Sequence, residues 1–205
     1  MEADSGIERA LAAVRNGLPV LLPTDTVYGL VTSSSRDEYA SRLYKLKGRS
    51  ERQPTALLAA SVDDLLTCVP ELDALAGVII RELLPGPYTL ILPNPARRFP
   101  WLTGTRTDAI GVRVAELPAS AARVVAGVCC VVATSANEPG EPSPARLDDV
   151  PDRIRFACAA EIDAGTLTGR PSTVIDFTGA EPYVVREGAA PSAEALARVR
   201  QALAA

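Results

Sequence analysis

The segment PTDTVYGL, residues 23–30, follows the short apolar run Leu18–Leu22 and anchors the prediction of the fold. Five consecutive apolar residues before a polar turn are typical of a buried strand. Thr24 and Thr26 alternate, so their side chains should face the same way, whereas Asp25 should face the other way. The segment therefore predicts a buried strand that ends in hydroxyls and a carboxylate. The alternative is an ordinary turn whose side chains bind their own backbone.

Outward from this segment, helical and extended patterns alternate along the chain. Ser5 with Glu8 forms a capping-box pattern, and Gly17 stands where the first helix should end. Five further helices are expected: one that ends at Gly48, one that begins at Ser61, one that ends at Leu84, one over Pro118–Ala126, and a terminal one that carries Leu196, Val199 and Leu203. Further strands are expected at Thr55–Ala59, Tyr88–Leu92, Ile110–Val114, Val128–Ala133, Thr173–Phe177 and Tyr183–Val185. This alternation predicts an α/β layer structure.

The composition suits one compact domain over residues 1–205, with 47% hydrophobic and 22% charged residues. The net charge of −4 does not favour nucleic acid across the whole surface, so any anion must be held by a local cluster. The amino terminus lacks a signal pattern, and no apolar run approaches the ~18 residues that cross a bilayer. We expect a soluble, cytoplasmic protein that is not associated with a membrane.

The chain contains no histidine, which excludes Ser-His-Asp and Cys-His catalytic arrangements and the commonest zinc ligand. Its four cysteines, at positions 68, 129, 130 and 158, show no C-x-x-C spacing. Strand geometry should point Cys129 and Cys130 to opposite faces, so we expect buried, reduced thiols and no metal site. Chemistry in this chain must rely on charge and positioning.

The segment KLKGRSERQP, residues 45–54, concentrates cations in an acidic chain. Lys47 falls in the last helical turn, where a cation offsets the helix dipole, and Gly48 can close the helix in a left-handed conformation. Arg49 and Arg52 lie beyond that stop. A guanidinium on a loop beside a sheet suits a phosphate or a carboxylate, although local evidence alone does not establish that role.

Three further segments place polar groups next to strands. TSANEPGEPS, residues 134–143, follows one strand; RPSTV, residues 170–174, introduces another; and Arg186 ends a third. Each alone is consistent with a polar turn or a solvated arginine. Because the chain lacks both G-x-x-x-x-G-K-[ST] and G-x-G-x-x-G, the familiar nucleotide sites are disfavoured, and an open polar cavity over the sheet is expected.

The region from Asn94 to Asp108 has no clear period and is expected to be a long loop. Its arginines, Arg97, Arg98 and Arg106, could form a mobile cover over a nucleotide or a local patch for RNA.

Six motifs occur in a fixed order along the chain: PTDTVYGL, KGR with Pro54 five positions after Arg49, PGPYTLIL, GVRV, TSAN with GEPSP, and PSTVID before Arg186. This ordered set resembles the YrdC-like threonylcarbamoyl-AMP synthase family in its short, single-domain form. The resemblance covers about residues 7–188 and leaves a terminal helix over 191–204. It implies a twisted, mixed β-sheet surrounded by helices, with a central polar cavity lined by positive charge.

The resemblance also implies the reaction and its partners. L-threonine, bicarbonate or carbon dioxide, and ATP would give threonylcarbamoyl-AMP and pyrophosphate, with Mg²⁺ arriving on the nucleotide. A separate transferase complex would then deliver the threonylcarbamoyl group to tRNA.

Site residues follow from the same motifs. Lys47 and Arg49 would be catalytic; Lys47, Arg49, Gln53, Asn137, Ser143 and Arg186 would bind ATP; and Thr26, Arg113, Ser135 and Ser172 would bind threonine. The sequence departs from many relatives at three places. Leu58 stands near a common histidine, Ala109 replaces a common hydroxyl residue, and Arg170-Pro171 replaces Val-Glu.

Two alternatives are open at this level. One is a divergent paralogue that handles a carbamoyl-adenylate for another acceptor, and the other is a non-catalytic module that binds structured RNA.

Overall fold

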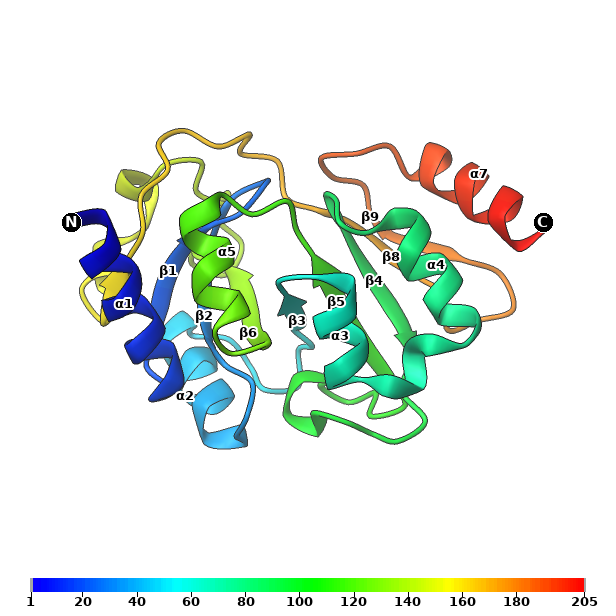
Figure 1. The fold of residues 1–205 in the computed structure, drawn as a ribbon, viewed down its shortest axis with the longest axis horizontal. Helices are drawn as coiled ribbons and strands as arrows, with labels where there is room; N and C mark the ends of the chain where they lie inside the picture. The colour runs from blue at the N-terminus through cyan, green and yellow to red at the C-terminus, as the bar shows by residue number, and fades with distance from the viewer. Residues whose placement is uncertain (1, 205) are drawn as a thin grey trace.

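The computed structural model describes residues 2–204, with side chains from residue 4 onward (Figure 1). The helices are α1 (Glu2–Arg15), α2 (Asp37–Lys47), α3 (Val62–Cys68), α4 (Leu75–Leu83), α5 (Ala119–Ala126), α6 (Asp152–Arg155) and α7 (Ser192–Leu203). The strands are β1 (Val20–Pro23), β2 (Tyr28–Ser33), β3 (Ala56–Ala59), β4 (Tyr88–Pro93), β5 (Ala109–Val114), β6 (Cys130–Ser135), β7 (Ala160–Glu161), β8 (Thr173–Asp176) and β9 (Tyr183–Arg186). Short 3-10 helices cover Pro70–Asp73, Pro100–Leu102 and Leu147–Asp149.

The strands form one twisted, mixed sheet in the order β7-β1-β2-β6-β3-β5-β4-β8-β9. The β1–β7, β3–β5 and β4–β8 pairs are parallel, and the other neighbours are antiparallel. The fold-class prediction is therefore confirmed. The sheet runs continuously between the ends of the molecule, and α1 and α7 lie at opposite ends (Figure 1).

Several local signals act as expected. Gly48 ends α2 with φ of 68°, and its N–H donates to the carbonyls of Lys45 and Tyr44. Ser61 caps α3 by accepting a hydrogen bond from the Asp64 N–H at 3.0 Å. The end of α2 and the start of α3 were therefore predicted correctly, from a glycine that adopts a left-handed conformation and a serine that caps a helix.

Other boundaries differ from the prediction. Helix α1 begins at Glu2, so Ser5 lies inside it rather than at its cap. Strand β2 was not predicted, because all six of its residues are buried and give no alternating pattern. Strand β6 begins at Cys130 instead of Val128, since Cys129 has a positive φ of 67° that breaks the extended conformation.

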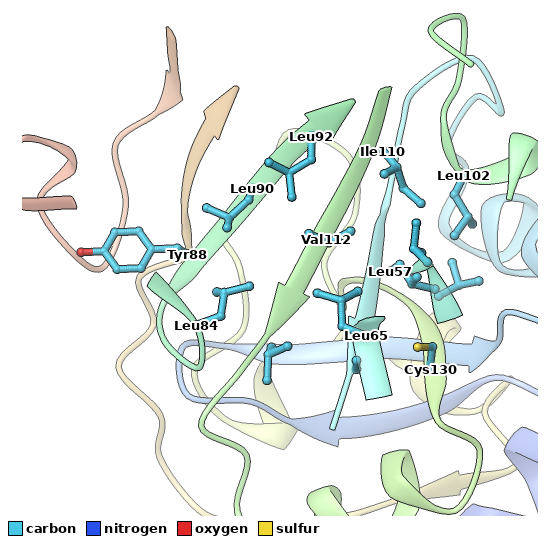
Figure 2. Packing of buried hydrophobic residues seen from close by; sticks show 14 of the residues in the cluster. Leu57, Leu65, Leu84, Tyr88, Leu90, Leu92, Leu102, Ile110, Val112 and Cys130 are labelled. Carbon is cyan, nitrogen blue, oxygen red and sulfur yellow. The ribbon is translucent and has the colours of Figure 1, made fainter. Parts of the chain in front are cut away.

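One face of the central strands is packed with apolar side chains. Leu57, Leu90 and Val112 are each 0% exposed and lie in the largest apolar cluster of the described chain, together with residues of α2, α3, α4 and α7. Figure 2 shows this cluster along β4 and β5. Helix α7 packs beside α4 over this part of the sheet (Figure 1). The division into a core over 7–188 and a terminal helix over 191–204 stays a prediction.

The opposite face is covered only in part. Helices α1 and α5 pack on β1, β2, β3 and β6 through a second apolar cluster that includes Leu22, Val31 and Val131. Farther along the same face, alternate residues of β4, β5 and β8 remain partly exposed: Thr89, Ile91, Gly111, Arg113 and Val174. No helix in the described part of the chain is both long and apolar enough to cross a membrane.

Candidate active site

The partly covered face holds a cavity of about 340 Å³. Strands β2, β3, β4, β5, β6, β8 and β9 and neighbouring loops form its walls. The described lining residues are Thr24, Val27, Gly29, Arg49, Pro54, Thr55, Ala56, Leu58, Thr89, Ile91, Thr103, Arg106, Ala109, Gly111, Arg113, Ala133, Thr134, Ser135, Pro171, Ser172, Val174, Val185 and Arg186. This volume is in the range of small-molecule sites.

Positive charge dominates the cavity. Four arginines line it, and no lining residue in the described part of the chain is acidic. The pKa of Arg186 is lowered first by partial burial of its guanidinium and then by the charges of Arg113 and Arg49, so Arg186 feels the repulsion of both neighbouring arginines. An anion bound here would relieve that repulsion.

Arg49 reaches the cavity from the loop after α2. Its Nη1 donates to Thr134 Oγ1 at 3.2 Å and its Nη2 to the Pro54 carbonyl at 2.6 Å. Its Nε is buried and has no hydrogen-bond partner among the described residues. Burial lowers the pKa of Arg49, so an anionic ligand would stabilise its charged form.

Arg113 projects from β5 and forms a buried ion pair with Asp25. The same Nη2 donates to Thr26 Oγ1 at 2.7 Å. Both Arg113 Nε and Asp25 Oδ2 are buried and lack a partner within residues 4–204. Burial lowers the pKa of Arg113, and the Asp25 charge opposes that shift. One donor of the Arg113 guanidinium, Nε, is therefore unused within the described residues.

Thr26 supports Arg113 rather than lining the cavity. It is 0% exposed, and its Oγ1 lies 3.0 Å from Thr24 Oγ1. Thr24 itself is a lining residue, so the two hydroxyls do lie together as the alternation predicts. The prediction that Asp25 faces away from Thr24 and Thr26 is wrong, because Asp25 and Thr26 both accept a hydrogen bond from the same Arg113 nitrogen, Nη2.

Lys47 lies beneath the TSAN segment and outside the lining. Its Nζ donates to the Ser135 carbonyl at 2.5 Å, the Asn137 carbonyl at 2.7 Å and Asn137 Oδ1 at 2.8 Å. Burial, followed by the charge of Arg49, lowers the Lys47 pKa to about 8. In this structure the ammonium group holds the segment that carries Ser135, and contact with ATP stays a prediction.

Asn137 and Ser143 line a second hollow of about 440 Å³, together with Pro142, Asp149 and Gly169. Asn137 Oδ1 accepts from Ser135 Oγ at 2.5 Å. Ser135 lines the first cavity and Asn137, two residues later, lines the second hollow, so the two hollows are neighbours at this segment.

Ser172 and Arg186 form the side of the cavity at β8 and β9. Arg186 donates to the Ser172 carbonyl through Nη2 at 2.8 Å, and Thr89 Oγ1 lies 2.8 Å from Ser172 Oγ. Arg186 is exposed and Ser172 is buried, so Arg186 lies at the rim. Gln53 is also exposed, but it lines neither hollow; its N–H donates to the Ser50 carbonyl.

The central loop is tied to the rest of the protein at several points. Asn94 is 1% exposed, and its side chain binds the carbonyls of Arg98 and Thr107. Arg98 pairs with Glu71. Arg106 alone of the three loop arginines lines the cavity, and it pairs with Asp176.

The sequence missed several lining residues, including Thr55, Thr89 and Thr134. Their signal is the spacing of two along predicted strands, as in Thr89 and Ile91 or Gly111 and Arg113, which places them on one face. Most of the positions at which the sequence departs from many relatives also lie at the cavity. Leu58, Ala109 and Pro171 line it, whereas Arg170 is exposed and does not line it.

Comparison with known proteins identifies the family of this chain. The Sua5/YciO/YrdC family model, described as "Telomere recombination", matches residues 12–188. A Chromohalobacter salexigens protein named threonylcarbamoyl-AMP synthase is 35% identical over 182 residues, which cover 88% of this chain and 97% of that protein.

Two solved structures share the fold. Pyrococcus abyssi Sua5 complexed with L-threonine aligns with a TM-score of 0.80 and 29% identity, covering 94% of this chain and 56% of that one. Escherichia coli YciO aligns with a TM-score of 0.77 and 28% identity, covering 90% of each chain. The chain thus spans about half of the Pyrococcus protein and nearly all of the Chromohalobacter one. The chain belongs to the Sua5/YciO/YrdC family.

Proposed function

We propose that this chain is a threonylcarbamoyl-AMP synthase, a nucleotidyltransferase that forms threonylcarbamoyl-AMP and pyrophosphate from L-threonine, bicarbonate or carbon dioxide, and ATP. The observation that carries the proposal is the cluster of Arg49, Arg113 and Arg186 in a cavity whose described lining has no acidic residue. All the anionic reactants can be neutralised there.

Threonine would bind through its carboxylate to Arg113. The unpartnered Nε of Arg113 offers one donor, and Thr26 and Asp25 hold the guanidinium in place. Ser135 ends β6 and Ser172 precedes β8, with three strands of the sheet between them, and both would offer hydroxyl groups to the rest of the amino acid. A charge-assisted bond of this kind fixes orientation as well as affinity.

ATP would place its phosphates against Arg49 and Arg186. The buried Nε of Arg49 needs an acceptor, and a phosphate oxygen would supply one. Asn137 and Ser143 would contact the part of the nucleotide that enters the second hollow, with Gln53 at the exposed edge. Mg²⁺ would enter on the phosphates, since the described lining offers it no carboxylate.

The reaction needs positioning and charge neutralisation. The amine of threonine captures carbon dioxide and loses one proton, giving a carbamate. A carbamate oxygen then attacks the α-phosphorus, the bond to the β-phosphate oxygen breaks, and pyrophosphate leaves with its electron pair. Arg49 would neutralise charge on the leaving group, and Lys47 would position the Ser135–Asn137 segment. None of these steps requires a histidine.

The product would be consumed by a separate transferase that modifies tRNA, in the cytoplasm. The test of the proposal is pyrophosphate release from ATP and bicarbonate, scanned across the amino acids, with labelled bicarbonate traced into the adenylate. We expect release and incorporation with threonine and background values when threonine is omitted. Release that ignores the amino acid, or labelled product with a different amino acid only, would overturn the assignment.

A further inference from the structure

Three of the four cysteines converge on the packed side of β6. The Sγ atoms of Cys68, Cys129 and Cys130 all lie within 4.8 Å of one another, and those of Cys68 and Cys129 are 3.2 Å apart. Cys68 is the last residue of α3, and Cys130 is the first residue of β6. None of the three lines the cavity described above.

The backbone at Cys129 explains why neighbouring thiols meet. Two successive residues of a regular strand point to opposite faces. Cys129 has a φ of 67°, a left-handed conformation that is uncommon outside glycine. This conformation turns the Cys129 side chain toward Asp64, whose carbonyl lies 3.4 Å from the Cys129 Sγ and 3.9 Å from the Cys130 Sγ. Backbone strain held at a cluster of reactive groups is a sign of function.

The carboxylate of Asp64 lies beside the three thiols. Asp64 stands one helical turn before Cys68 on α3, so both side chains share a face of that helix. Asp64 Oδ1 lies 3.8 Å from Cys129 Sγ. Its other oxygen, Oδ2, accepts a hydrogen bond from Ser61 Oγ at 2.7 Å. Carboxylate ligands of metals are held by such secondary hydrogen bonds.

We propose that Cys68, Cys129, Cys130 and Asp64 bind a thiophilic divalent cation, Zn²⁺, in a tetrahedral site. Zn–S bonds of about 2.3 Å at tetrahedral angles place sulfur atoms about 3.8 Å apart. The pair at 3.2 Å needs to separate by only about half an ångström, and the three sulfur atoms already lie within 4.8 Å of one another. Asp64 lies outside that group of three and would turn toward the ion from its place 3.8 Å from Cys129 Sγ. Thiolate-rich sets favour zinc over magnesium or calcium. Each thiol that binds the ion releases one proton to solvent.

The ion joins the end of α3 to the start of β6. Strand β6 carries Thr134 and Ser135 to the cavity at its other end, while Cys130 is 1% exposed within the packed core. The site is therefore structural: it fixes the strand from behind and takes no part in the reaction. A closed set of four ligands is the arrangement of structural zinc sites.

The experiment uses the whole chain, stripped of metal with a chelator under reducing conditions. Zn²⁺ is titrated against a chromophoric competitor, and Co²⁺ is used as a spectroscopic probe of thiolate ligation. We expect one ion per chain, a thiolate-to-cobalt charge-transfer band, release of up to three protons, and a higher unfolding temperature with Zn²⁺.

The decisive variant is Cys129→Gly. Glycine adopts the left-handed conformation without strain, so this variant removes a ligand while keeping the backbone. We expect its Zn²⁺ affinity to fall at least ~100-fold, since even changes next to a ligand cost 10- to 100-fold, and we expect Cys68→Ser to behave alike. Cys158→Ser is the matched control: this fourth thiol donates to the Ile154 carbonyl and lies outside the cluster.

Three outcomes would overturn the site. They are no Zn²⁺ binding by the reduced chain, equal binding by wild type and Cys129→Gly, or loss of binding in Cys158→Ser alone. Circular dichroism of each variant separates lost ligation from lost folding. All of these measurements are made without substrates, so the synthase proposal can fail or stand independently.

Discussion

The two faces of β5 differ sharply although they belong to the same six residues. Ile110, Val112 and Val114 are each at most 1% exposed and pack under helices, whereas Gly111 and Arg113 line the cavity. One strand thus supplies stability on one side and charge on the other. Because side chains alternate, a change on one face can leave the other intact, and the assignment of each face can be tested separately.

The largest effect is expected from Arg49→Ala on the cavity face. Loss of a donor that neutralises the leaving group should lower adenylate formation by ~10²- to 10³-fold, which corresponds to about 3 to 4 kcal/mol. Pyrophosphate release measures it, and the unfolding temperature should change little. Unchanged release would remove Arg49 from the catalytic role.

Leu90→Ala tests the packed face. Leu90 is 0% exposed, so the cavity left by the substitution should lower the free energy of unfolding by about 3 kcal/mol. Urea denaturation measures the change. Activity per folded molecule should persist at low temperature. Val185→Ala is the comparison, because Val185 is 50% exposed and its loss should cost less than ~0.5 kcal/mol. Equal losses from the two variants would contradict the packing.

Lys47 belongs to neither face of β5, because it is a buried cation that lies outside the cavity. Burial lowers its folded-state pKa to about 8, below its ordinary value of 10.5. Between these values the unfolded chain holds a proton that the folded chain has lost, so stability attributable to Lys47 should rise with pH across this window. From pH 7 to 9.5 the gain should be about 2 kcal/mol.

The control for this prediction is Lys47→Met, which cannot titrate. It should be less stable at neutral pH, because three oxygens lose their donor, and it should lack the Lys47 part of the pH slope. Parallel stability profiles for wild type and Lys47→Met would show that the ammonium group keeps its ordinary pKa.

The smallest of these effects is expected from Arg113→Lys. Lysine keeps the charge but loses the planar fork, so the KM for threonine should rise about tenfold, which corresponds to about 1.4 kcal/mol. The KM for ATP should change far less. Steady-state kinetics in threonine and in ATP separate the two. An unaltered threonine KM would place the amino acid elsewhere in the cavity.

The sequence predicted features that depend on single residues with a defined role. The left-handed stop at Gly48 and the cap at Ser61 are both confirmed, since each follows from local backbone chemistry. The arginines at positions 49, 113 and 186 were named from ordered motifs, and the structure brings all three to one cavity.

Features that depend on tertiary packing were not predicted. Strand β2 is buried on both sides and so lacks a period, and the Lys47 side chain turns into three carbonyl or amide oxygens that only the folded chain assembles. The meeting of Cys129 and Cys130 was predicted wrongly, because one positive φ reverses the alternation of a strand. These features are set by contacts between distant segments.

We expect the arginines of the open face to bind the nucleotide. Calorimetric titration of Mg-ATP into the double variant Arg49→Gln/Arg186→Gln tests this binding, with Arg52→Gln as the control. Arg52 is exposed and lines neither hollow. We predict an affinity at least ~100-fold weaker in the double variant, about 2.7 kcal/mol, and unchanged in the control. Equal affinity in all three proteins, or equal weakening in both variants, would contradict it.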